Sequence, residues 1–412
     1  MKVMMLVEAN YPLDIRVRQE ALKLKEHGHQ IAVIAIKERG QKFSETVNGV
    51  KVYRIPKIEL FKRGKHLITT KRTAMGKLVT VAKAILGYGF EFSYFTLACY
   101  MLSWFVFFRD GFTVIHTHNP PDTLFIVALL WKPFGTKFVY DHHDLSPDLF
   151  LEKYGKKGKF VYKLLLFLER MSCRTADIII ATNESYKKIE IERCGVPSEK
   201  IYVVRNGPNL KEMRISKPIK DIRRRAHTIL CYLGAINIQD GLDYLLEALK
   251  ELVYAFGYND VLLLVVGDGD YLTKIKELAK QLKLDNHIFF TGLITDRKEL
   301  CRLLSTADIF VDAAPKSFLN DSSTFIKHME YMIFGKPVVS FELKESMYSL
   351  NGAGVFAKPN DTEDMAKKIL ELINDENRRA RIGRVARERV KCLSWEKVSI
   401  PLVQAYKELE RL

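Results

Sequence analysis

The residue types best suited to chemistry gather in one stretch, 319–339, where a polar loop precedes an amphipathic run and a buried strand. The loop carries hydroxyl, amide and carboxylate side chains, those of Asn320, Asp321, Ser322, Ser323 and Thr324. Such residues cap helix starts, so the pattern predicts a helix over 323–334 that ends at Gly335. Lys327 and Glu330 lie three residues apart and share one face of that helix.

Free backbone amides, a cation and a carboxylate at one helix start suit a ligand that carries phosphates and hydroxyl groups. The alternative is an ordinary capped surface helix in which Lys327 and Glu330 form an (i, i+3) ion pair. The choice depends on the elements that position this stretch.

The chain has 412 residues, of which 48% are hydrophobic, enough for two or three domains with a large core. Its six cysteines are scattered without a C-x-x-C pair, so neither a disulfide framework nor a zinc site is predicted, and a reducing cytosol is expected. The short apolar run 3–7 is typical of a buried first strand rather than a signal peptide.

Short β-rich runs alternate with helical stretches, which predicts an α/β protein with parallel, doubly wound sheets. In the first half, strands are expected at 3–7, 31–36, 113–116, 137–140, 177–181 and 202–204. In the second half, they are expected at 228–233, 261–266, 287–291, 309–311, 338–341 and 355–356.

The segment 208–226 is polar, holds two prolines, lacks apolar periodicity and is interpreted as a linker. The pattern on either side predicts two Rossmann-like domains in tandem, 1–207 and 227–395. The amphipathic helix 396–412 is expected to pack back on the first domain.

In open parallel sheets, ligands bind beyond the carboxyl ends of the strands, so the residues after each strand are the candidates. The loop after the first strand lacks G-x-G-x-x-G, which argues against a nicotinamide dinucleotide. Arg16, at the start of the next helix, is placed to fork onto a phosphate or to pair with Glu20 at (i, i+4).

His116 and His118 share a face of their strand, and His118 is expected in the following loop as a substrate contact rather than a buried structural histidine. No third ligand at metal spacing accompanies them, so no metal is predicted. The next strand leads into a polar loop that is interpreted as lining a cleft rather than chelating an ion, formed by Asp141, His142, His143 and Asp144.

In the second half, Gly267, Asp268 and Gly269 follow a buried strand, where glycines let the backbone approach a ligand closely. Leu293 and Ile294 follow the next strand, where their backbone groups can face the edge of a base.

The net charge of +16 is unevenly distributed, because residues 51–87 hold ten lysines and arginines against a single acidic residue. Mixed with apolar residues, this segment predicts a surface for anionic lipid; nucleic acid, or a merely solvated basic face, is the alternative. The run 92–108 has no formal charge and is at the lower limit for spanning a bilayer. Because the soluble pattern resumes at 113–116, a buried or partly membrane-dipping helix is expected.

In this order the motifs resemble the retaining glycosyltransferases of family 4, which have the GT-B fold, over nearly the whole chain. The motifs are H-x-H ending at His118, GDG at 267–269, FFTGLI at 289–294, TADIFV at 306–311, the Glu330 helix with GKPVVS, and SWE at 394–396. The run YDHHDLSPDLF at 140–150 is similar to a subgroup that makes bacterial surface polysaccharides.

The resemblance implies two domains that face a cleft and a UDP- or GDP-linked sugar donor held mainly by the second domain, without a cofactor or a metal. It matches Glu330 to a carboxylate that accepts from ribose hydroxyls, and His118 to a histidine beside the donor sugar. It places Gly269 and the backbone of 293–294 near the diphosphate and base.

The chain departs from the family pattern where phosphates bind. The family has a second glutamate eight positions before Glu330, where this chain has Ser322, so Asn320 or Asp321 is the expected substitute. The family's basic pair falls near Ala235 and Asp240, and its glycine pair in the first loop is absent. The expected replacement cations are Lys327 and Arg16, with Arg205 and Lys316 behind them.

The sequence therefore predicts transfer of a sugar, with retention, from a nucleoside-diphosphate donor to a hydroxyl of a lipid-linked saccharide. The expected setting is bacterial surface polysaccharide synthesis at the inner face of the cytoplasmic membrane, on anionic lipid bound by 51–108. A nucleotide-sugar 2-epimerase of the same fold, and a non-catalytic binder of membrane or nucleic acid, are the alternatives; no nucleic acid partner is expected.

Overall fold

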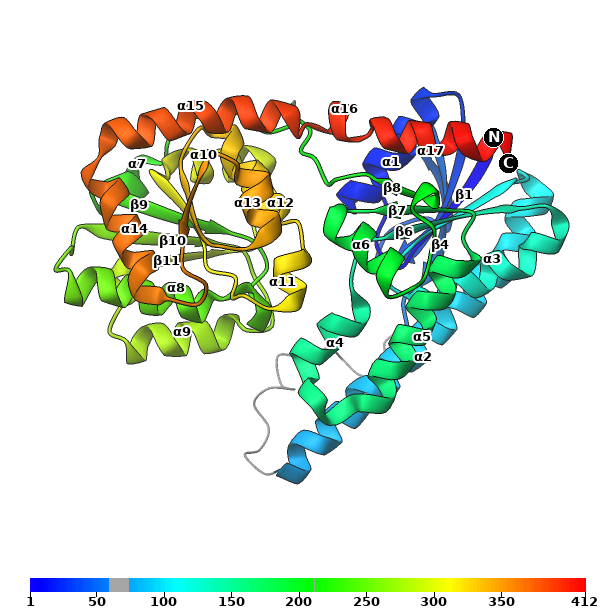
Figure 1. Cartoon of the computed structure of the whole chain (residues 1–412), viewed down its shortest axis with the longest axis horizontal. Coiled ribbons are helices and arrows are strands. Elements are labelled where there is room, and N and C mark those ends of the chain that lie inside the picture. Colours follow the sequence, from blue (N-terminus) through cyan, green and yellow to red (C-terminus); the bar gives the residue numbers. More distant parts are fainter. Residues whose placement is uncertain (59–73, 211) are drawn as a thin grey trace. The chain divides into compact units, whose positions relative to one another are not determined.

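The computed structural model describes residues 1–58, 74–210 and 212–412, apart from the side chains of 74–85, 156 and 157. The chain forms two compact units (Figure 1). Unit 1 comprises Met1–Arg205 and Ser399–Leu412, and unit 2 comprises Asn206–Val398. The first domain was expected to end at 207 and its returning helix to begin at 396, so the observed limits differ by a few residues.

Unit 1 contains an eight-stranded sheet in the order β3-β4-β2-β1-β5-β6-β7-β8. Strand β3 is antiparallel to β4, and the other neighbouring pairs are parallel. The strands are β1 (Lys2–Val7), β2 (Gln30–Lys37), β3 (Ser44–Val47), β4 (Val50–Pro56), β5 (Val114–His118), β6 (Lys137–His142), β7 (Ile178–Ala181) and β8 (Ile201–Val203).

The helices of unit 1 include the returning C-terminal helix. They are α1 (Ile15–Glu26), α2 (Ala74–Arg109), α3 (Phe125–Trp131), α4 (Ser146–Tyr154), α5 (Lys159–Thr175), α6 (Glu184–Glu192) and α17 (Ile400–Arg411). Helix α1 begins after Asp14, whose side chain accepts a hydrogen bond from Val17 N at 3.0 Å and caps the first turn.

Unit 2 contains a parallel six-stranded sheet in the order β11-β10-β9-β12-β13-β14. The strands are β9 (Thr228–Leu233), β10 (Val261–Val266), β11 (Ile288–Gly292), β12 (Ile309–Asp312), β13 (Val338–Phe341) and β14 (Gly354–Ala357). The helices are α7 (Lys220–Arg223), α8 (Leu242–Lys250), α9 (Leu272–Gln281), α10 (Arg297–Thr306), α11 (Phe318–Ser322), α12 (Ile326–Ile333), α13 (Lys344–Leu350), α14 (Thr362–Asn374), α15 (Glu376–Cys392) and α16 (Trp395–Val398).

Both faces of the unit 2 sheet are buried, as the doubly wound prediction requires. Along β10, Leu263 and Val265 belong to one hydrophobic cluster, while Leu262 and Leu264 belong to another. Alternate residues of a strand point to opposite faces, so each cluster lies under the helices of one face. The α/β class with two Rossmann-like units is therefore confirmed.

The segment 208–226, interpreted from the sequence as a linker, belongs to unit 2. Its residues Met213 and Ile222 are buried, and the amide of Ile219 donates to Thr306 Oγ1 at 2.9 Å in the last turn of α10. Met213 and Ile222 are nine residues apart and form no periodic apolar pattern, so the sequence did not predict that this segment packs against unit 2.

Helix α2 contains the uncharged run 92–108. Its part Leu86–Arg109 is, among the described residues, the one helix long and apolar enough to cross a membrane, and 33% of its most apolar window is buried. However, β4 precedes α2 and β5 follows it in the same sheet, so a single crossing would divide that sheet. One face of the helix is buried through Phe95, Cys99 and Val106.

Candidate functional site

The loops at the carboxyl ends of the unit 2 strands are joined into one surface. In the loop after β9, the amide of Ile236 donates to the carbonyl of Asp268 in the loop after β10, at 3.1 Å. The side chain of Asn320, from α11, donates through Nδ2 to the carbonyl of Gln239 at 2.9 Å. The structure therefore brings two of the nominated segments, the Asp268 turn and the Asn320 helix, against the same loop after β9.

The glycines of the 267–269 turn have a packing role that the sequence interpretation missed. A Cβ on Gly267 would lie 1.9 Å from the carbonyl oxygen of Gly234, and a Cβ on Gly269 would lie 2.3 Å from that of Ile236. Both carbonyls belong to the loop after β9, so the missing side chains make room for that loop. The approach of a ligand to these glycines stays a prediction.

The predicted helix start at 323 is wrong. Residues 320–322 belong to α11, which is capped by Ser317, whose hydroxyl accepts from Asn320 N at 3.1 Å. Helix α12 begins at Ile326, and its N-cap residue Phe325 has no side-chain cap. Ser317 is an equally good cap residue upstream, which is why the run of polar residues alone did not locate the start.

The polar side chains between the two helices bond mostly to the protein. Asp321 Oδ1 accepts from Lys344 N at 2.9 Å, and Ser323 Oγ donates to Leu319 O at 2.7 Å. The predicted end of the helix is confirmed, because Gly335 follows it with φ +64°.

Lys327 is buried at the end of β12 rather than displayed on a surface. Its Nζ lies 2.7 Å from Asp312 Oδ1, and Asp312 Oδ2 lies 2.7 Å from His328 Nε2. The ammonium also lies over the ring of Tyr232, 4.7 Å from its centroid. The first turn of α12 is thereby attached to the end of β12 through one carboxylate.

The charges of this cluster shift the pKa values of both Lys327 and Asp312. Burial acts to lower the pKa of Lys327, but Asp312 outweighs it and raises that pKa. Burial acts to raise the pKa of Asp312, but Lys327 and the hydrogen bond from His328 hold it below its usual range. The ion pair is therefore charged at neutral pH.

Glu330 has a different partner, so the (i, i+3) ion pair with Lys327 is not the arrangement observed. Its Oε1 lies 4.0 Å from Arg297 Nη1, and Arg297 Nη2 is 3.2 Å from Glu212 Oε2. The Glu330 side chain is 15% exposed, and burial raises its pKa to about 7 against the opposing charge of Arg297. A carboxyl of this kind exchanges its proton near neutral pH.

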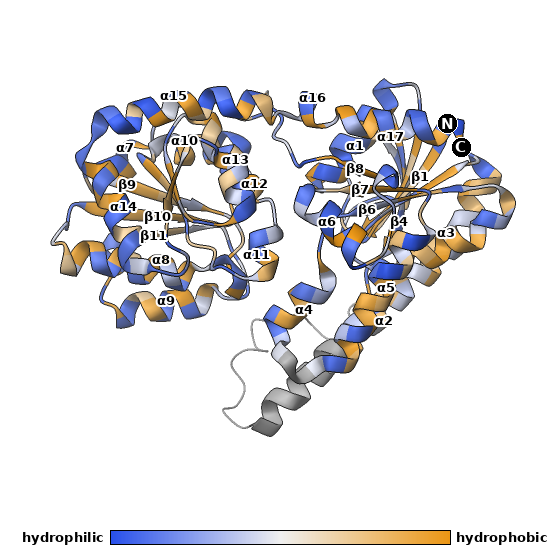
Figure 2. Cartoon of the chain, in the orientation of Figure 1, coloured by the Kyte–Doolittle hydropathy of each residue, from blue (hydrophilic) through white to orange (hydrophobic). Residues whose placement is uncertain are grey.

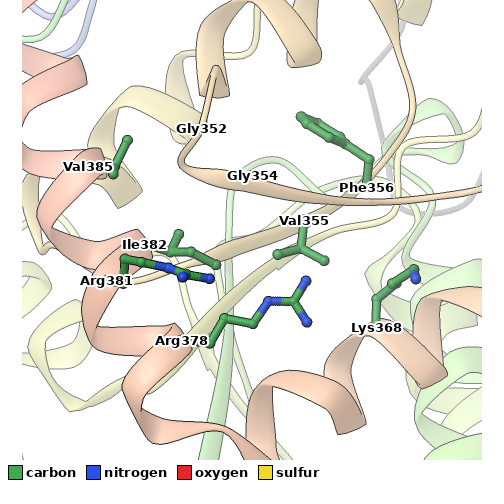
Figure 3. A pocket seen from close by; sticks show the side chains of 9 residues that line it. All are labelled: Gly352, Gly354, Val355, Phe356, Lys368, Arg378, Arg381, Ile382 and Val385. Carbon is green, nitrogen blue, oxygen red and sulfur yellow. The ribbon is translucent and has the colours of Figure 1, made fainter.

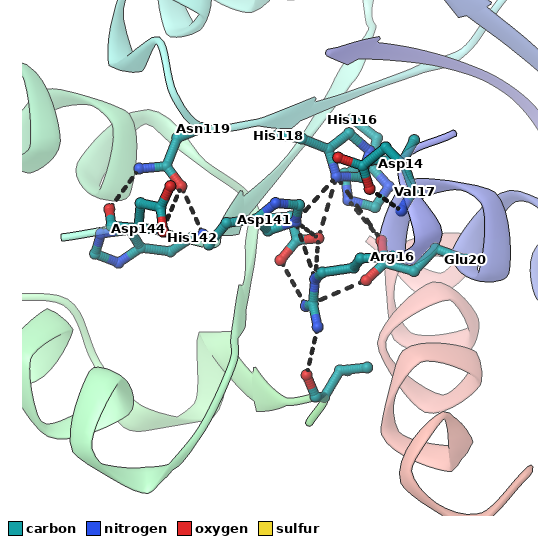
Figure 4. A network of polar contacts seen from close by, with 12 residues as sticks. Asp14, Arg16, Val17, Glu20, His116, His118, Asn119, Asp141, His142 and Asp144 are labelled. Atoms are coloured by element: carbon teal, nitrogen blue, oxygen red, sulfur yellow. Dashed lines mark hydrogen bonds and ion pairs between the residues drawn. The ribbon is translucent and has the colours of Figure 1, made fainter. Parts of the chain in front are cut away.

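In unit 1, Asp141 is the centre of a buried polar network (Figure 4). The guanidinium of Arg16 grips it with two hydrogen bonds, Nη2 to Oδ1 at 2.7 Å and Nε to Oδ2 at 3.1 Å. His143 Nε2 and His118 Nδ1 lie 2.6 Å and 3.1 Å from Oδ2. Burial acts to raise the pKa of Asp141, but Arg16 and the two histidines hold it well below its usual range.

Arg16 is accordingly engaged by the protein through all three guanidinium nitrogens. Besides Asp141, Nη1 donates to the carbonyl of Val204 at 2.9 Å, and Nη2 lies 3.1 Å from Glu20 Oε1. The (i, i+4) pair with Glu20 is present, although it is buried. The prediction that Arg16 forks onto a phosphate is therefore corrected, because no nitrogen of the guanidinium is left for one.

His118 is buried as the last residue of β5 and not in the loop after it. The prediction that His116 shares its face is confirmed, with ring centroids 4.3 Å apart. His116 Nδ1 lies 2.9 Å from the hydroxyl of Tyr406 on α17, so the C-terminal helix completes the network. This is the structural environment named above as the alternative, and the contact of His118 with a sugar stays a prediction.

The statement that the two histidines lack a third ligand is wrong. Glu20, His116, His118 and Asp141 offer four ligand atoms within 4.8 Å of one another, all buried. The sequence missed this because α1 and β6 supply the carboxylates from distant positions. Arg16 brings one positive charge to these two carboxylates, and burial together with Asp141 raises the pKa of Glu20 well above its usual range. Catalysis without a metal stays a prediction.

The four residues interpreted as lining a cleft have different environments. Asp141 and His142 are buried within β6, and His142 Nδ1 lies 3.0 Å from Glu190 Oε1. His143 is half-buried and Asp144 is exposed. The interpretation is therefore corrected for Asp141 and His142, and it stays a prediction for the other two.

Most of the basic segment 51–87 lies outside the residues whose side chains the structure describes. Of its described cations, Lys51 pairs with Asp110, and Arg54 is buried and pairs with Glu45 at 2.6 Å. Arg54 is thus withdrawn from the surface, whereas Lys51 and Lys57 are exposed, and the contact of this segment with lipid stays a prediction. Among the remaining expected cations, Arg205 is buried and Lys316 is exposed, 3.9 Å from Asp321.

Unit 2 also has a pocket of about 500 Å³ at the start of β14 (Figure 3). Lys368, Arg378 and Arg381 line it, and the first two pair with Glu371 at 3.2 Å and 2.9 Å. It lies at the amino end of its strand, whereas ligands of parallel sheets bind at the carboxyl ends, so we do not assign it to the donor.

Comparison with known proteins identifies the class. Residues 14–212 match the model of Glycosyltransferase Family 4, and residues 218–389 match that of Glycosyl transferases group 1. The two matches follow one another and together span most of the chain. The chain belongs to the family 4 glycosyltransferases and has their GT-B fold.

Among its relatives is the chitobiosyldiphosphodolichol beta-mannosyltransferase of Candida albicans, 24% identical over 65% of this chain and 62% of that protein. Another is the O-antigen chain mannosyltransferase C of Escherichia coli, 23% identical over 68% of this chain and 71% of that protein. The chain thus matches about three fifths of the length of the first relatives. The solved structure of Anabaena HepE with UDP and glucose covers both chains completely, with 17% identity and a TM-score of 0.68, and shares the fold.

Proposed function

We propose that this glycosyltransferase moves a sugar from a nucleoside-diphosphate donor to a hydroxyl of a lipid-linked saccharide, with retention. The observation that carries the proposal is the set of joined loops after β9, β10 and β12 at the carboxyl ends of the unit 2 strands, beside helix α12 with the buried Lys327 and the partly buried Glu330. The binding of UDP and glucose by HepE supports a nucleotide-sugar donor, UDP- or GDP-linked.

In the reaction, the bond between the anomeric carbon and the diphosphate oxygen breaks, and the acceptor oxygen bonds to that carbon. The acceptor proton leaves with the departing phosphate or to solvent, so the step balances without a cofactor. Charge develops on the leaving diphosphate, and fixed amides and cations stabilise it. Glu330 accepts from the ribose hydroxyls, and the backbone at 293–294 lies beside the base.

Because Arg16 is bound within unit 1, the charge that neutralises the diphosphate has to come from other groups. Lys327 is paired with Asp312, so its field reaches a phosphate only in part. Lys316, which is exposed, adds to it, together with the backbone amides of the first turn of α12. The His118 contact with the donor sugar completes the proposed machinery.

The acceptor and the location follow from the relatives and from charge. Relatives named for dolichol-linked and O-antigen substrates support a saccharide acceptor carried on lipid, in bacterial surface polysaccharide synthesis. The basic segment and α2 support a peripheral position at the inner face of the cytoplasmic membrane, on anionic lipid.

The test is release of free sugar and nucleoside diphosphate from a panel of UDP- and GDP-sugars. We expect one donor to turn over slowly, and Glu330→Ala and Lys327→Ala to reduce that turnover at least tenfold. Because Lys327→Ala breaks a buried pair, thermal unfolding is measured alongside, and Glu330→Gln serves as the milder variant. Wild-type protein that releases nothing from any donor, or variants that turn over like wild type, would contradict the proposal.

Product analysis distinguishes the epimerase, which returns an isomeric sugar without an acceptor. The anomeric configuration of the transferred sugar, measured by NMR on a synthetic lipid-linked acceptor, tests retention directly. An inverted product would overturn that part and leave the transfer intact.

A further inference from the structure

Helix α2 carries a stripe of large apolar side chains that unit 1 leaves uncovered. The residues and their exposures are Leu86 66%, Phe90 44%, Leu97 63%, Met101 64% and Phe108 80%. Successive members are four or seven positions apart, so they lie on one face of the helix. Large apolar side chains that are exposed together on one helix face mark an interaction site in soluble proteins.

Helix α5 has a matching stripe that lies outside the segment nominated from the sequence. Phe160 is 80% exposed, Leu164 44% and Phe167 55%, and they occupy positions i, i+4 and i+7. Between the two helices in sequence, α3 exposes Ile126, Leu129 and Leu130. Helix α3 packs against both α2 and α5, and hydrophobic colour marks all three in Figure 2.

The charges around these stripes have one sign. Among the described side chains of α2, α3 and α5, every exposed charged residue is a lysine or an arginine: Arg109, Lys159, Lys163, Arg170 and Arg174. The acidic residues of these helices, Glu91 and Glu169, are buried. A surface with exposed aromatics and cations and with its carboxylates withdrawn is complementary to anionic lipid.

We propose that α2, α3 and α5 form one membrane-binding face, in which α5 lies in the headgroup region with Phe160, Leu164 and Phe167 inserted. This proposal deepens the proposed function by naming a second lipid-binding helix beyond 51–108. Its biological purpose rests on the proposed function, but the binding of lipid does not. A protein partner is disfavoured because lysines are depleted from the centres of protein interfaces, whereas Lys163 lies beside the apolar residues of α5.

The test is flotation of the full chain with vesicles of phosphatidylcholine, with and without phosphatidylglycerol, at low salt. We expect binding to the anionic vesicles and a loss of at least tenfold in Phe160→Asp/Phe167→Asp. The matched control is Ile400→Asp/Leu412→Asp, which places the same charges on two exposed apolar residues, 51% and 63% exposed, at the first residue of α17 and just after its last. This control is expected to bind like wild type. Lys159→Glu/Lys163→Glu is expected to remove the preference for anionic lipid.

The proposal is overturned if the Phe160/Phe167 variant floats like the control, or if wild type binds neutral and anionic vesicles equally. It is also overturned if sedimentation shows a stable wild-type dimer that this variant converts to monomer, because a second copy then covers the face. Calorimetric binding of UDP or GDP, measured on the same proteins, checks the fold and separates the two proposals. Vesicle binding without nucleotide binding would end the proposed function and leave the membrane face standing.

Discussion

Replacing Glu330 by glutamine tests whether this carboxyl meets the ribose, because its proton equilibrium near neutral pH makes the contact measurable. Its pKa is raised to about 7 by burial. At pH 7 about half of the molecules therefore carry the proton. Hydroxyl groups that donate to the carboxylate stabilise its charged form and lower the pKa, so nucleotide binding has to expel that proton.

The expected release at pH 7 is therefore about half a proton per nucleotide bound, falling toward zero at pH 9. Because the ionised form binds, affinity weakens as the pH falls below 7, by about tenfold per unit once protonation is nearly complete. The assay is titration calorimetry with UDP or GDP in two buffers of different ionisation enthalpy, which gives the proton number from the slope.

In Glu330→Gln the slope should vanish, and affinity should fall by roughly 10- to 100-fold, the scale of a charged hydrogen bond. The matched control is Glu299→Gln on α10, an exposed carboxylate that should leave both slope and affinity unchanged. Equal proton release by wild type and Glu330→Gln, or proton uptake by wild type, would refute the reasoning.

Three further outcomes follow from the geometry. Arg16→Ala should lower the free energy of unfolding, measured in urea, by about 3–5 kcal/mol, because it leaves buried Asp141 and Glu20 without their cation. An unchanged urea midpoint would contradict this structural role and favour the original prediction that Arg16 binds a phosphate. Gly267→Ala should lower stability by more than about 1 kcal/mol, because its Cβ would meet the Gly234 carbonyl 1.9 Å away; a variant as stable as wild type would show that the two loops separate easily. Donor turnover should persist in excess EDTA; a loss restored by one divalent ion would instead show that a metal takes part.

The strands were predictable because their apolar runs are local signals. β9, β10 and β13 have the predicted bounds, and each is buried on both faces. The β3–β4 hairpin was missed although its signal is present, since Asn48 and Gly49 both have positive φ, as an Asn-Gly hairpin turn requires. Helix α15 was also missed, because its surface is dominated by arginines and its apolar residues are few.

The sequence predicted where the candidate site lies, but it did not predict which side chains the nominated cations pair with. The order of parallel strands determines which loops meet, and the loops after β9, β10 and β12 do meet in unit 2. The partners of the nominated cations depend on contacts over long sequence separations, such as Arg16 with Asp141, 125 residues away. No local spacing encodes such a pair.

In both units the cation nominated from the sequence is paired with a buried aspartate. This pairing limits the positive charge that the cation can offer to a diphosphate. In each unit an aspartate at or next to the carboxyl end of a strand gathers a long cation and a histidine: Asp141 with Arg16 and His118, and Asp312 with Lys327 and His328. A phosphate approaching Lys327 therefore competes with Asp312 and does not meet a bare ammonium. The field of a neutralised pair falls off faster than that of a single charge. In the proposed site, backbone amides and exposed cations would therefore have to supply more of the stabilisation. In the proposed donor site, the chain around the start of α12 would therefore have to take over the role of basic side chains that Ala235 and Asp240 do not provide.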